Sequence, residues 1–391
     1  MIRWPTKPLG ELVDFIGGGT PRRDRPDYWG GEIPWASVKD LQNQSLGTTL
    51  EHITAEGLAN SASNLIPGGT VIIASRVGLG KVAVNQKPVA INQDLKALTP
   101  RDNNLLPRYL LLFLLSNAEY FEKAGVGATV KGLTIADYQN LKIPIPPLAE
   151  QERLVKLLDE ADELRKLRTQ ANRRTADLIP ALFHDIFGDA GHIAHNIRPL
   201  SEVAEVVSGV AKGRRFNGQK PVTVPYIRVA NVQAGYLDLA EIKTIEALPS
   251  EVKELTLKNG DVLLTEGGDF DKLGRGALWE REIPNCIHQN HVFRVRVDYS
   301  KLLPVYFEKF LQTPVAKRYF LGCAKRTTNL ASINMTQLRG LPVPVPSLTL
   351  QRDFAARVSE IRAMEFQQAA SRRRLDDLFH SLLHRAFQGE V

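Results

Sequence analysis

The sequence predicts an α+β protein built from two similar mixed α/β lobes and two long helices. Three observations support this fold class: the 391-residue chain repeats itself, each copy begins with short β-branched segments separated by turn residues, and each copy ends in a glycine-free segment with helical periodicity. The length suits two to three domains. The expected order is a lobe over residues 1–149, a helix over 150–188, a lobe over 189–349 and a helix over 350–391.

The repeat is visible in matching segments. LKIPIPPLAEQERL (Leu141–Leu154) returns 200 residues later as LPVPVPSLTLQRDF (Leu341–Phe354), and IPWASVKDL (Ile33–Leu41) returns 191 residues later as VPYIRVANV (Val224–Val232). Loop insertions explain why the offset differs between segments. A period of this length indicates a duplicated domain with a pseudo-two-fold internal repeat, because solenoid repeats run only about 20 to 50 residues.

Each lobe is expected to contain strands followed by a short helix. The short helices, over 107–116 and 304–312, open on a proline, which the first turn of a helix tolerates. The proline-rich segments after them predict an extended spacer, because proline fixes φ and has no N–H. Four strands are predicted in the β-branched runs Thr70–Ala74, Lys81–Val84, Asp261–Leu264 and Val292–Val297.

The two long helices are expected to pair as a coiled coil, because apolar residues recur in steps of three and four over 151–187 and 351–387. At about 1.5 Å per residue each helix would be roughly 55 Å long. Pro180 has no counterpart in the second copy, so the first helix is expected to kink or restart there. The predicted seam residues are Leu157, Ala161, Leu164, Leu178 and Leu182 in the first helix, and Ile361, Met364, Leu375, Leu378 and Leu382 in the second.

Composition excludes several classes of protein. Apolar content of 43% and charged content of 24% are typical of a globular chain, so a mainly disordered protein is excluded. Two cysteines cannot form a disulfide framework, and the first residues contain no apolar signal segment, so we expect a cytoplasmic protein. The net charge of +7 admits nucleic acid as a partner; residues 188–350 hold 21 basic against 16 acidic side chains and account for most of it.

The usual motifs of nucleotide-binding, methylating and metal-binding proteins are absent. GVGATVKG (Gly125–Gly132) does not have the spacing of a phosphate-binding loop, and no NPPY-like tetrapeptide of an amino-methyltransferase is present. The order of Cys286, His288, His291 and Cys323 matches no common zinc finger. We therefore expect no catalytic residue, no metal site and no cofactor in this chain, although a catalytic set assembled in space remains an alternative.

The ordered set of segments resembles the specificity subunit of a type I restriction–modification enzyme, over essentially the whole chain. GGGTPRRDRPDYWGGEIPWASVKDL (Gly17–Leu41) resembles the opening of one class of target-recognition domain, and PYIRVANVQAGYLDL (Pro225–Leu239) resembles the opening of another. IPIPPLAEQERL resembles the junction into the conserved helix of that family, and it occurs in both halves, with the second copy degraded to VPVPSLTLQRDF.

This resemblance implies a fold and a function. The lobes would be target-recognition domains that each read one half of a bipartite, asymmetric DNA site, and the helices would pack antiparallel and hold the lobes a fixed distance apart. Two modification subunits with S-adenosylmethionine and two restriction subunits that use ATP and Mg would be partners. The specificity subunit itself would be non-catalytic.

The residues expected to touch DNA are cations in glycine-rich loops and near strand ends, where Arg can bind guanine or phosphate. The pairs Asn92-Gln93 and Gln289-Asn290 either read adenine or serve the fold, and the tryptophans either stack on bases or pack in the lobes. For any single cation the alternative is a solvated surface side chain. The candidates are Arg22, Arg23, Arg25, Lys39, Arg76, Lys81 and Lys131 in the first lobe, and Lys212, Arg214, Arg215, Arg228, Lys272, Arg275, Lys325 and Arg326 in the second.

Two other functions stay open from the sequence. A stand-alone coiled-coil DNA-binding or scaffold protein would show the same repeat, and it would not co-purify with a methyltransferase. An enzyme with two β-rich catalytic lobes would show activity without partners. An enzyme duplication would more often repeat its polar catalytic residues, whereas here the lobes diverge and the helices repeat in register.

Overall fold

The computed structural model describes residues 4–124, 133–188, 196–216, 218–268, 273–326 and 331–391. The chain forms two compact units, which are described one at a time. Unit 1 comprises residues 1–170 and 369–391, and unit 2 comprises residues 171–368. The division therefore falls inside both long helices, so each unit contains a lobe, the start of the helix that follows this lobe, and the end of the other helix.

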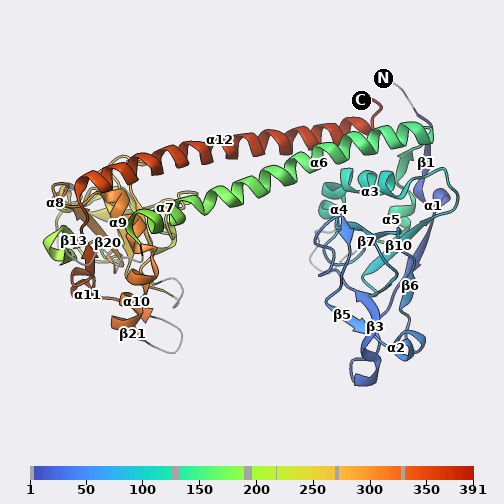
Figure 1. Cartoon of the computed structure of the whole chain (residues 1–391), viewed down its shortest axis with the longest axis horizontal. Helices are drawn as coiled ribbons and strands as arrows, with labels where there is room; N and C mark the ends of the chain where they lie inside the picture. The colour runs from blue at the N-terminus through green and yellow to red at the C-terminus, as the bar shows by residue number, and fades with distance from the viewer. Residues whose placement is uncertain (1–3, 125–132, 189–195, 217, 269–272, 327–330) are drawn as a thin grey trace. The chain divides into compact units, whose positions relative to one another are not determined.

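Unit 1 is built on two sheets (Figure 1). One sheet has the order β2-β10-β7-β8-β4 and the other has the order β5-β3-β9-β6, while β1 and β11 form a separate pair. The strands are β1 Thr6–Pro8, β2 Val13–Gly17, β3 Trp29–Ala36, β4 Ser45–Leu46, β5 Glu51–Ile53, β6 Asn64–Ile66, β7 Val71–Ala74, β8 Val82–Asn85, β9 Val89–Ile91, β10 Leu95–Pro100 and β11 Lys142–Pro144.

Short helices surround these sheets, and α3 packs on β7 and β8. Leu106 precedes α3 with an extended backbone, and Pro107 supplies the first helical residue, as the sequence predicts. Six consecutive residues of α3, Tyr109–Leu114, are buried because the helix lies between the sheet and α6. The helices that begin in unit 1 are α1 Leu9–Leu12, η1 Pro26–Tyr28, α2 Ala55–Ala59, α3 Pro107–Ser116, α4 Ala118–Ala124, α5 Ile135–Gln139 and α6 Leu148–Ala176.

Unit 2 repeats this plan with a four-stranded sheet β13-β20-β16-β18 and a three-stranded sheet β15-β14-β19. A third small sheet has the order β17-β22-β21, and β12 pairs with β23. The strands are β12 Ile197–Pro199, β13 Ala204–Ser208, β14 Val222–Ile227, β15 Lys243–Ala247, β16 Val262–Thr265, β17 Gly267–Gly268, β18 Gly276–Leu278, β19 Ile287–His288, β20 Val292–Val297, β21 Lys325–Arg326, β22 Ala331–Ser332 and β23 Pro342–Pro344.

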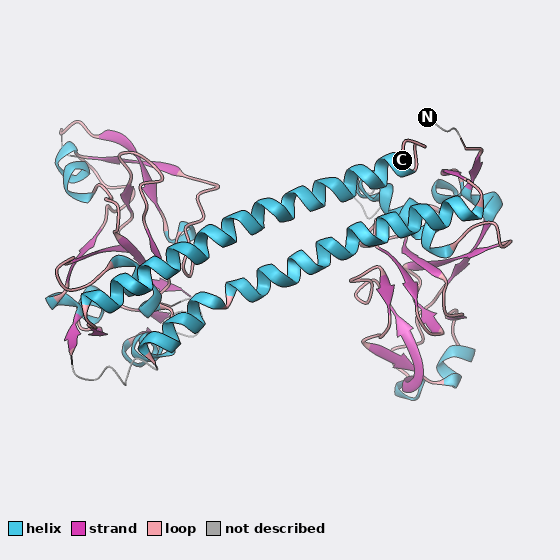
Figure 2. Ribbon diagram, turned by 45° about the horizontal axis from the view of Figure 1, so that its top comes forward, coloured by secondary structure: helices cyan, strands magenta, loops and turns pink. Residues whose placement is uncertain are grey.

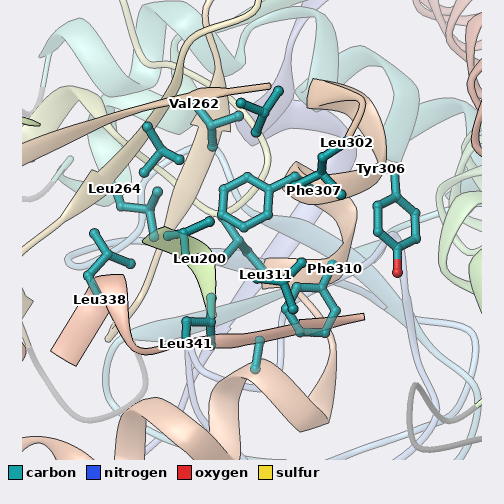
Figure 3. Close-up of a cluster of buried hydrophobic side chains, with 14 of the residues drawn as sticks. Leu200, Val262, Leu264, Leu302, Tyr306, Phe307, Phe310, Leu311, Leu338 and Leu341 are labelled. Atoms are coloured by element: carbon teal, nitrogen blue, oxygen red, sulfur yellow. The ribbon is translucent and has the colours of Figure 1, made fainter. Parts of the chain in front are cut away.

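The core of unit 2 forms where its four-stranded sheet meets α9 and the start of α12 (Figure 3). Val262 and Leu264 on β16 face Phe307 and Phe310 on α9, and all four side chains are buried. The helices that begin in unit 2 are α7 Leu178–Phe187, η2 Leu200–Glu202, η3 Val229–Asn231, α8 Pro249–Leu255, α9 Pro304–Leu311, α10 Pro314–Cys323, α11 Met335–Arg339 and α12 Leu348–Ala386.

Matching hydrogen bonds confirm the internal repeat. The Tyr109 hydroxyl donates to the carbonyl of Pro144 at 3.0 Å, and the Tyr306 hydroxyl donates to the carbonyl of Pro344 at 3.0 Å. The predicted strands and proline-opened helices form within one or two residues of the expected bounds. The expected interruption near Pro180 is also confirmed, because α6 ends at Ala176 and α7 begins at Leu178, whereas α12 runs without a break.

The two long helices run antiparallel within each unit (Figure 2). In unit 1, Arg165 on α6 bonds to Asp376 on α12 at 2.8 Å, and Arg153 donates to the carbonyl of Val391 at 2.8 Å. In unit 2, Phe187 on α7 packs against Phe354 near the start of α12, with ring centroids 5.3 Å apart. Contacts therefore pair early residues of one helix with late residues of the other.

The predicted register of the helix seam is wrong at four positions. The buried residues are instead those that pack on the lobes as well as on the other helix, such as Leu154 and Leu158 on α6 and Phe379 and Leu383 on α12. A helix that serves both neighbours buries a wider face than a coiled-coil seam. The other six predicted seam residues are partly buried. The exposed four are Leu164 (53% exposed), Leu178 (42%), Met364 (45%) and Leu378 (48%).

Candidate nucleic-acid interface

In unit 1 the candidate interface is organised around the turn of residues 92–94, here called the central turn. Gly19 donates its N–H to the carbonyl of Ile91, and a side chain at Gly18 would overlap the same carbonyl. Ser75 donates its N–H to the carbonyl of Asp94 at 2.8 Å. The central turn thus joins two segments far apart in sequence, the glycine–arginine segment (residues 17–25) and the glycine loop (residues 75–81).

The amide side chains of the central turn serve the fold. Asn92 is buried, donates its Nδ2–H to Asp94 at 3.1 Å and accepts the N–H of Asp94 at 3.1 Å. Gln93 is exposed and accepts a hydrogen bond from the Thr20 hydroxyl. Of the two interpretations open from the sequence, the hydrogen bonds of Asn92 support the structural one.

The arginines of the glycine–arginine segment are exposed but already paired with carboxylates. Arg22 bonds to Asp24 at 2.7 Å and Arg25 bonds to Asp27 at 2.6 Å. Arg23 binds Glu51 on β5 through both terminal nitrogens. Exposed ion pairs of this kind contribute little to stability because water screens them, so a negatively charged ligand can displace the carboxylates from these three guanidinium groups.

Two tryptophans fix the position of Arg23. Its guanidinium lies 3.8 Å from the ring centroid of Trp29, and Trp29 packs edge-on against Trp35 at 5.1 Å. The Trp35 indole donates to the carbonyl of Gly19 at 3.1 Å, and the hydrogen bond from Arg23 lowers the pKa of Glu51. These tryptophans therefore pack within the lobe, as one of the two predicted alternatives requires.

The glycine loop presents cations without carboxylate partners. Gly78 and Gly80 have φ of 67° and 86°, which favours glycine and shapes the loop. Arg76 and Lys81 are exposed, and among the described residues neither forms an ion pair. Lys39, after β3, is likewise exposed and without an ion pair in the described part of the chain.

Lys96 belongs to this group, and sequence reasoning missed it. It lies on β10 opposite Gly17 and Ile73, next to the central turn, and its side chain is partly buried. Burial and the nearby Arg76 both lower its pKa. A signal was present, because LKALTP places a charged residue between the apolar residues Leu95 and Ala97 of a strand.

Unit 2 has an equivalent central turn at residues 289–291, with different chemistry. Gln289 donates its N–H to the carbonyl of Ile227, as Asn92 does to Ala36 in unit 1. His291 takes the place of Asp94, and its Nδ1 lies 2.5 Å from the Glu266 carboxylate. Sequence reasoning did not select this His–Glu pair.

The predicted cations of unit 2 fall into paired and unpaired groups. Arg214 pairs with Glu251 on α8, and Arg228 pairs with Glu241 at 3.1 Å. Arg275 donates to the Gln233 side chain at 2.8 Å. Two exposed cations, Lys212 and Arg215, form no ion pair with any described residue.

The small sheet β17-β22-β21 brings the Lys325–Arg326 strand to the central-turn side of unit 2. Ile333 donates its N–H to the carbonyl of Glu266, and β22 pairs with both β17 and β21. The backbone at these two cations therefore lies close to the segment after β16. Two predicted DNA-binding residues, Lys131 and Lys272, lie outside the described residues.

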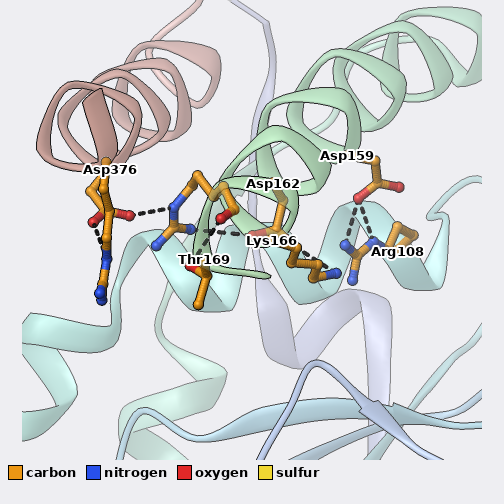
Figure 4. A network of polar contacts seen from close by, with 8 residues as sticks. Arg108, Asp159, Asp162, Lys166, Thr169 and Asp376 are labelled. Carbon is orange, nitrogen blue, oxygen red and sulfur yellow. Dashed lines mark hydrogen bonds and ion pairs between the residues drawn. The ribbon is translucent and has the colours of Figure 1, made fainter. Parts of the chain in front are cut away.

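The long helices carry a polar network in unit 1 (Figure 4). Arg165 bonds to Asp162 at 3.2 Å and to Asp376 on α12 at 2.8 Å, and its guanidinium lies 4.4 Å from the Phe379 ring. Lys166 adds a second cation to the buried Asp162 at 2.9 Å. Arg108 on α3 binds Asp159, so the network joins the lobe, α6 and α12.

Residues of catalytic and metal-binding types are used structurally. His288 is buried and donates its Nδ1–H to the carbonyl of Val292 at 2.7 Å, and burial lowers its pKa to about 4. Burial also raises the pKa of Cys286 to about 12, so its thiol is a weak nucleophile. Within the described residues no group of three His, Cys, Asp or Glu side chains could hold a metal ion. None of the described helices is long and apolar enough to cross a membrane.

Known proteins are similar to this chain in sequence and in fold. A family model described as the type I restriction modification DNA specificity domain matches residues 1–174. The EcoR124I/EcoR124II specificity subunit of Escherichia coli is 33% identical over 184 residues, which span 45% of each protein. The EcoKI specificity subunit of Escherichia coli (strain K12) is 24% identical over 418 residues, covering 99% of this chain and 89% of that subunit.

Solved structures show the same fold over the whole chain. A chain from the type I R-M system, solved in work on its complex assembly and conformational transition, has a TM-score of 0.69 at 18% identity and covers 100% of this chain and 99% of its own length. The HsdS subunit from Thermoanaerobacter tengcongensis has a TM-score of 0.51 at 18% identity, covering 99% and 97%. The chain is therefore similar to type I restriction–modification specificity subunits, in sequence most clearly over residues 1–174 and in fold over its whole length.

Proposed function

We propose that this chain is the DNA sequence-recognition subunit of a type I restriction–modification complex. Each lobe reads one half of a bipartite, asymmetric DNA site, and the helices set the separation of the halves. The observation that carries this proposal is the contrast between a constant frame and variable loops. Tyr109 and Tyr306 make the same hydrogen bond, whereas the two central turns present different side chains.

Two equivalent positions beside the central turns show this contrast most clearly. Lys96 pairs with Gly17 and Ile73 across the sheet of unit 1, and Phe293 takes the same place opposite Ser208 and Leu264 in unit 2. Equivalent backbones with different donors and acceptors suit two readers of different base sequences. This arrangement favours recognition over a duplicated catalytic site, which would repeat its polar residues.

The expected partners are double-stranded DNA, two modification subunits and two restriction subunits, and the expected compartment is the cytoplasm. S-adenosylmethionine, ATP and Mg would be bound by those partner subunits, and this chain would be non-catalytic. The long helices are the proposed docking elements for the modification subunits. The exposed apolar residues Leu164, Leu167 and Phe366 along these helices support that role, because exposed large apolar side chains are typical of protein interfaces.

Methylome sequencing tests the proposal. The host expresses this chain with its modification subunit, and a single asymmetric bipartite sequence should be methylated. Replacing residues 1–145 with the first lobe of another family member should change one half of this sequence and leave the other half intact. A change in both halves, or no methylated motif at all despite a co-purified modification subunit, would refute the assignment.

A stand-alone DNA-binding or scaffold protein is the weaker alternative. The comparisons with specificity subunits do not favour it. Co-purification separates the two, because a specificity subunit should carry a methyltransferase through affinity purification and a scaffold should not.

A further inference from the structure

Arg76 and Lys96 bring two positive charges together at one end of the β2-β10-β7-β8-β4 sheet. Lys96 lies on β10 opposite Ile73 of β7, and Arg76 follows β7 after Ser75, whose N–H is held by the carbonyl of Asp94. Two cations gathered by the backbone repel each other unless an anion lies between them.

Among the described residues, no carboxylate forms an ion pair with Arg76 or Lys96. Asp94 lies near Lys96 and its charge raises the Lys96 pKa, but its carboxylate accepts a hydrogen bond from the Asn92 side chain at 3.1 Å and forms no ion pair with Lys96. This situation differs from that of Arg22, Arg23 and Arg25, which all have carboxylate partners.

The lowered pKa of Lys96 supports the same view. Burial is the larger cause and the charge of Arg76 is the next, so the protein holds this ammonium group where its charge is unfavourable. Folding alone does not require a charge at this position, because the equivalent residue in unit 2 is the buried Phe293. The residue equivalent to Arg76 in unit 2 is Gly267. It follows Glu266, whose N–H donates to the carbonyl of His291 as the N–H of Ser75 donates to that of Asp94.

From this geometry we infer that Arg76 and Lys96 form a phosphate-binding site on the first lobe, which grips the DNA backbone beside the half-site read by that lobe. The inference rests on the proposed function and adds that the two lobes bind the DNA backbone differently. Phosphate contacts position a lobe on the duplex without reading sequence. The second lobe lacks this pair and presents the Glu266–His291 pair at the equivalent place, so the two lobes differ in their dependence on salt.

The test is the salt dependence of DNA binding by the full chain with its modification subunit. Removing one phosphate contact lowers the slope of log K against log salt by about 0.9, so the double variant Arg76→Gln/Lys96→Gln should lower it by about 1.8. The decrease in this slope should be equal on a duplex that carries the methylated sequence and on a scrambled duplex. Lys87→Gln is the matched control. Lys87 is exposed and follows the end of β8 that is farther from the glycine loop.

Thermal melting separates binding from folding. Lys96→Met should melt at the same temperature as the wild-type protein or higher, because it removes an unfavourably placed charge, while its affinity for DNA falls about tenfold or more at low salt. An unchanged salt slope in the double variant would overturn the inference, and so would a lower melting temperature of Lys96→Met. If the wild-type complex shows no preference for the methylated sequence over the scrambled one, the proposed function fails instead.

Discussion

Gln151 and Gln351 are fully buried side chains that fasten each long helix to its lobe. Gln151 accepts the N–H of Leu106 at 3.0 Å and donates to two backbone carbonyls, those of Asn104 and Pro146. Gln351 makes the same three bonds in unit 2, to Leu303, Lys301 and Pro346. A neutral amide is suited to this place because it can accept and donate at once.

Removing either amide should destabilise its own unit. Gln151→Ala leaves one N–H and two carbonyls without partners in a buried place, and we expect a loss of about 3 kcal/mol in the free energy of unfolding. Gln351→Ala should have a similar effect on unit 2. Hydrogen exchange of the strands in each unit measures the loss, and Glu152→Ala, at an exposed position on the same helix, is the control. If the strand amides of unit 1 were equally protected from hydrogen exchange in Gln151→Ala and in the control, the prediction would be contradicted.

His288 makes the stability of unit 2 depend on pH. Its pKa is lowered to about 4 by burial, so the folded protein holds the imidazole neutral while the unfolded chain binds a proton below about pH 6.5. The contribution of His288 to the free energy of unfolding is fully present above about pH 6.5 and is lost as the pH falls from about 6.5 to about 4. At about 1.4 kcal/mol per pH unit the loss reaches roughly 3 kcal/mol.

Chemical unfolding at a series of pH values checks this expectation. His288→Asn should flatten the curve between pH 6.5 and 4, whatever its effect on absolute stability. His52→Asn, at an exposed position in unit 1, should leave the curve unchanged. A wild-type protein whose stability is constant over this range would show that His288 is accessible to protons.

At the scale of elements, the ends of the long helices complete the hydrophobic cores. Phe379 and Leu383 of α12 are buried in the core of unit 1, and Phe183 and Phe187 of α7 are buried in the core of unit 2. Each lobe therefore depends on a helix end that follows the other lobe in the sequence. Aromatic contacts strengthen the arrangement, since Phe183 stacks on Tyr306 at 5.6 Å.

Truncating these residues should destabilise one unit at a time. Phe379→Ala should weaken unit 1 and Phe183→Ala should weaken unit 2, each by about 3 to 5 kcal/mol, because a large buried side chain is lost and a cavity remains. Hydrogen exchange resolved by residue distinguishes the two units. Phe366→Ala is the matched control, because Phe366 lies on α12 but is 72% exposed. If either core variant destabilised both units equally, the expectation that each helix end stabilises one unit would be contradicted.

At the scale of the whole molecule, we expect the paired helices to set the length of DNA between the two half-sites. Inserting seven residues after Gln170 and seven after Gln368 adds about 10 Å to each helix, which corresponds to about three base pairs at 3.4 Å each. Methylome sequencing should then report the same two half-sites separated by a spacer about three base pairs longer. An unchanged spacer with both helices extended would show that the helices do not act as a ruler.

Much of the fold could be predicted because it follows from local patterns. The strand Val292–Val297 forms over the residues expected from its alternation and β-branched content, and the helix interruption before Pro180 follows from the chemistry of proline. The seam was harder to predict. Leu164 and Met364 fit a repeat of three and four residues, yet they are exposed because the lobes also pack on the helices and shift the buried face.

The candidate site could be predicted only in part. Sequence reasoning found the cations of the glycine loop, but it could not tell that Arg23 would meet Glu51 on another strand while Arg76 would meet no described carboxylate. Lys96 was missed because its importance comes from its place on β10 beside Arg76. Ion pairs depend on which segments lie side by side, and local spacing does not encode that.

The sequence by itself determined the duplication, the alternation of lobes and helices, the proline-opened short helices and the resemblance to specificity subunits. These properties follow from local sequence patterns and from the repeat, and neither depends on contacts between distant residues. Only the tertiary structure decided which helix end completes which core and which cations remain unpaired. Those outcomes depend on contacts such as that of Arg165 with Asp376, whose partners lie 211 residues apart in the chain.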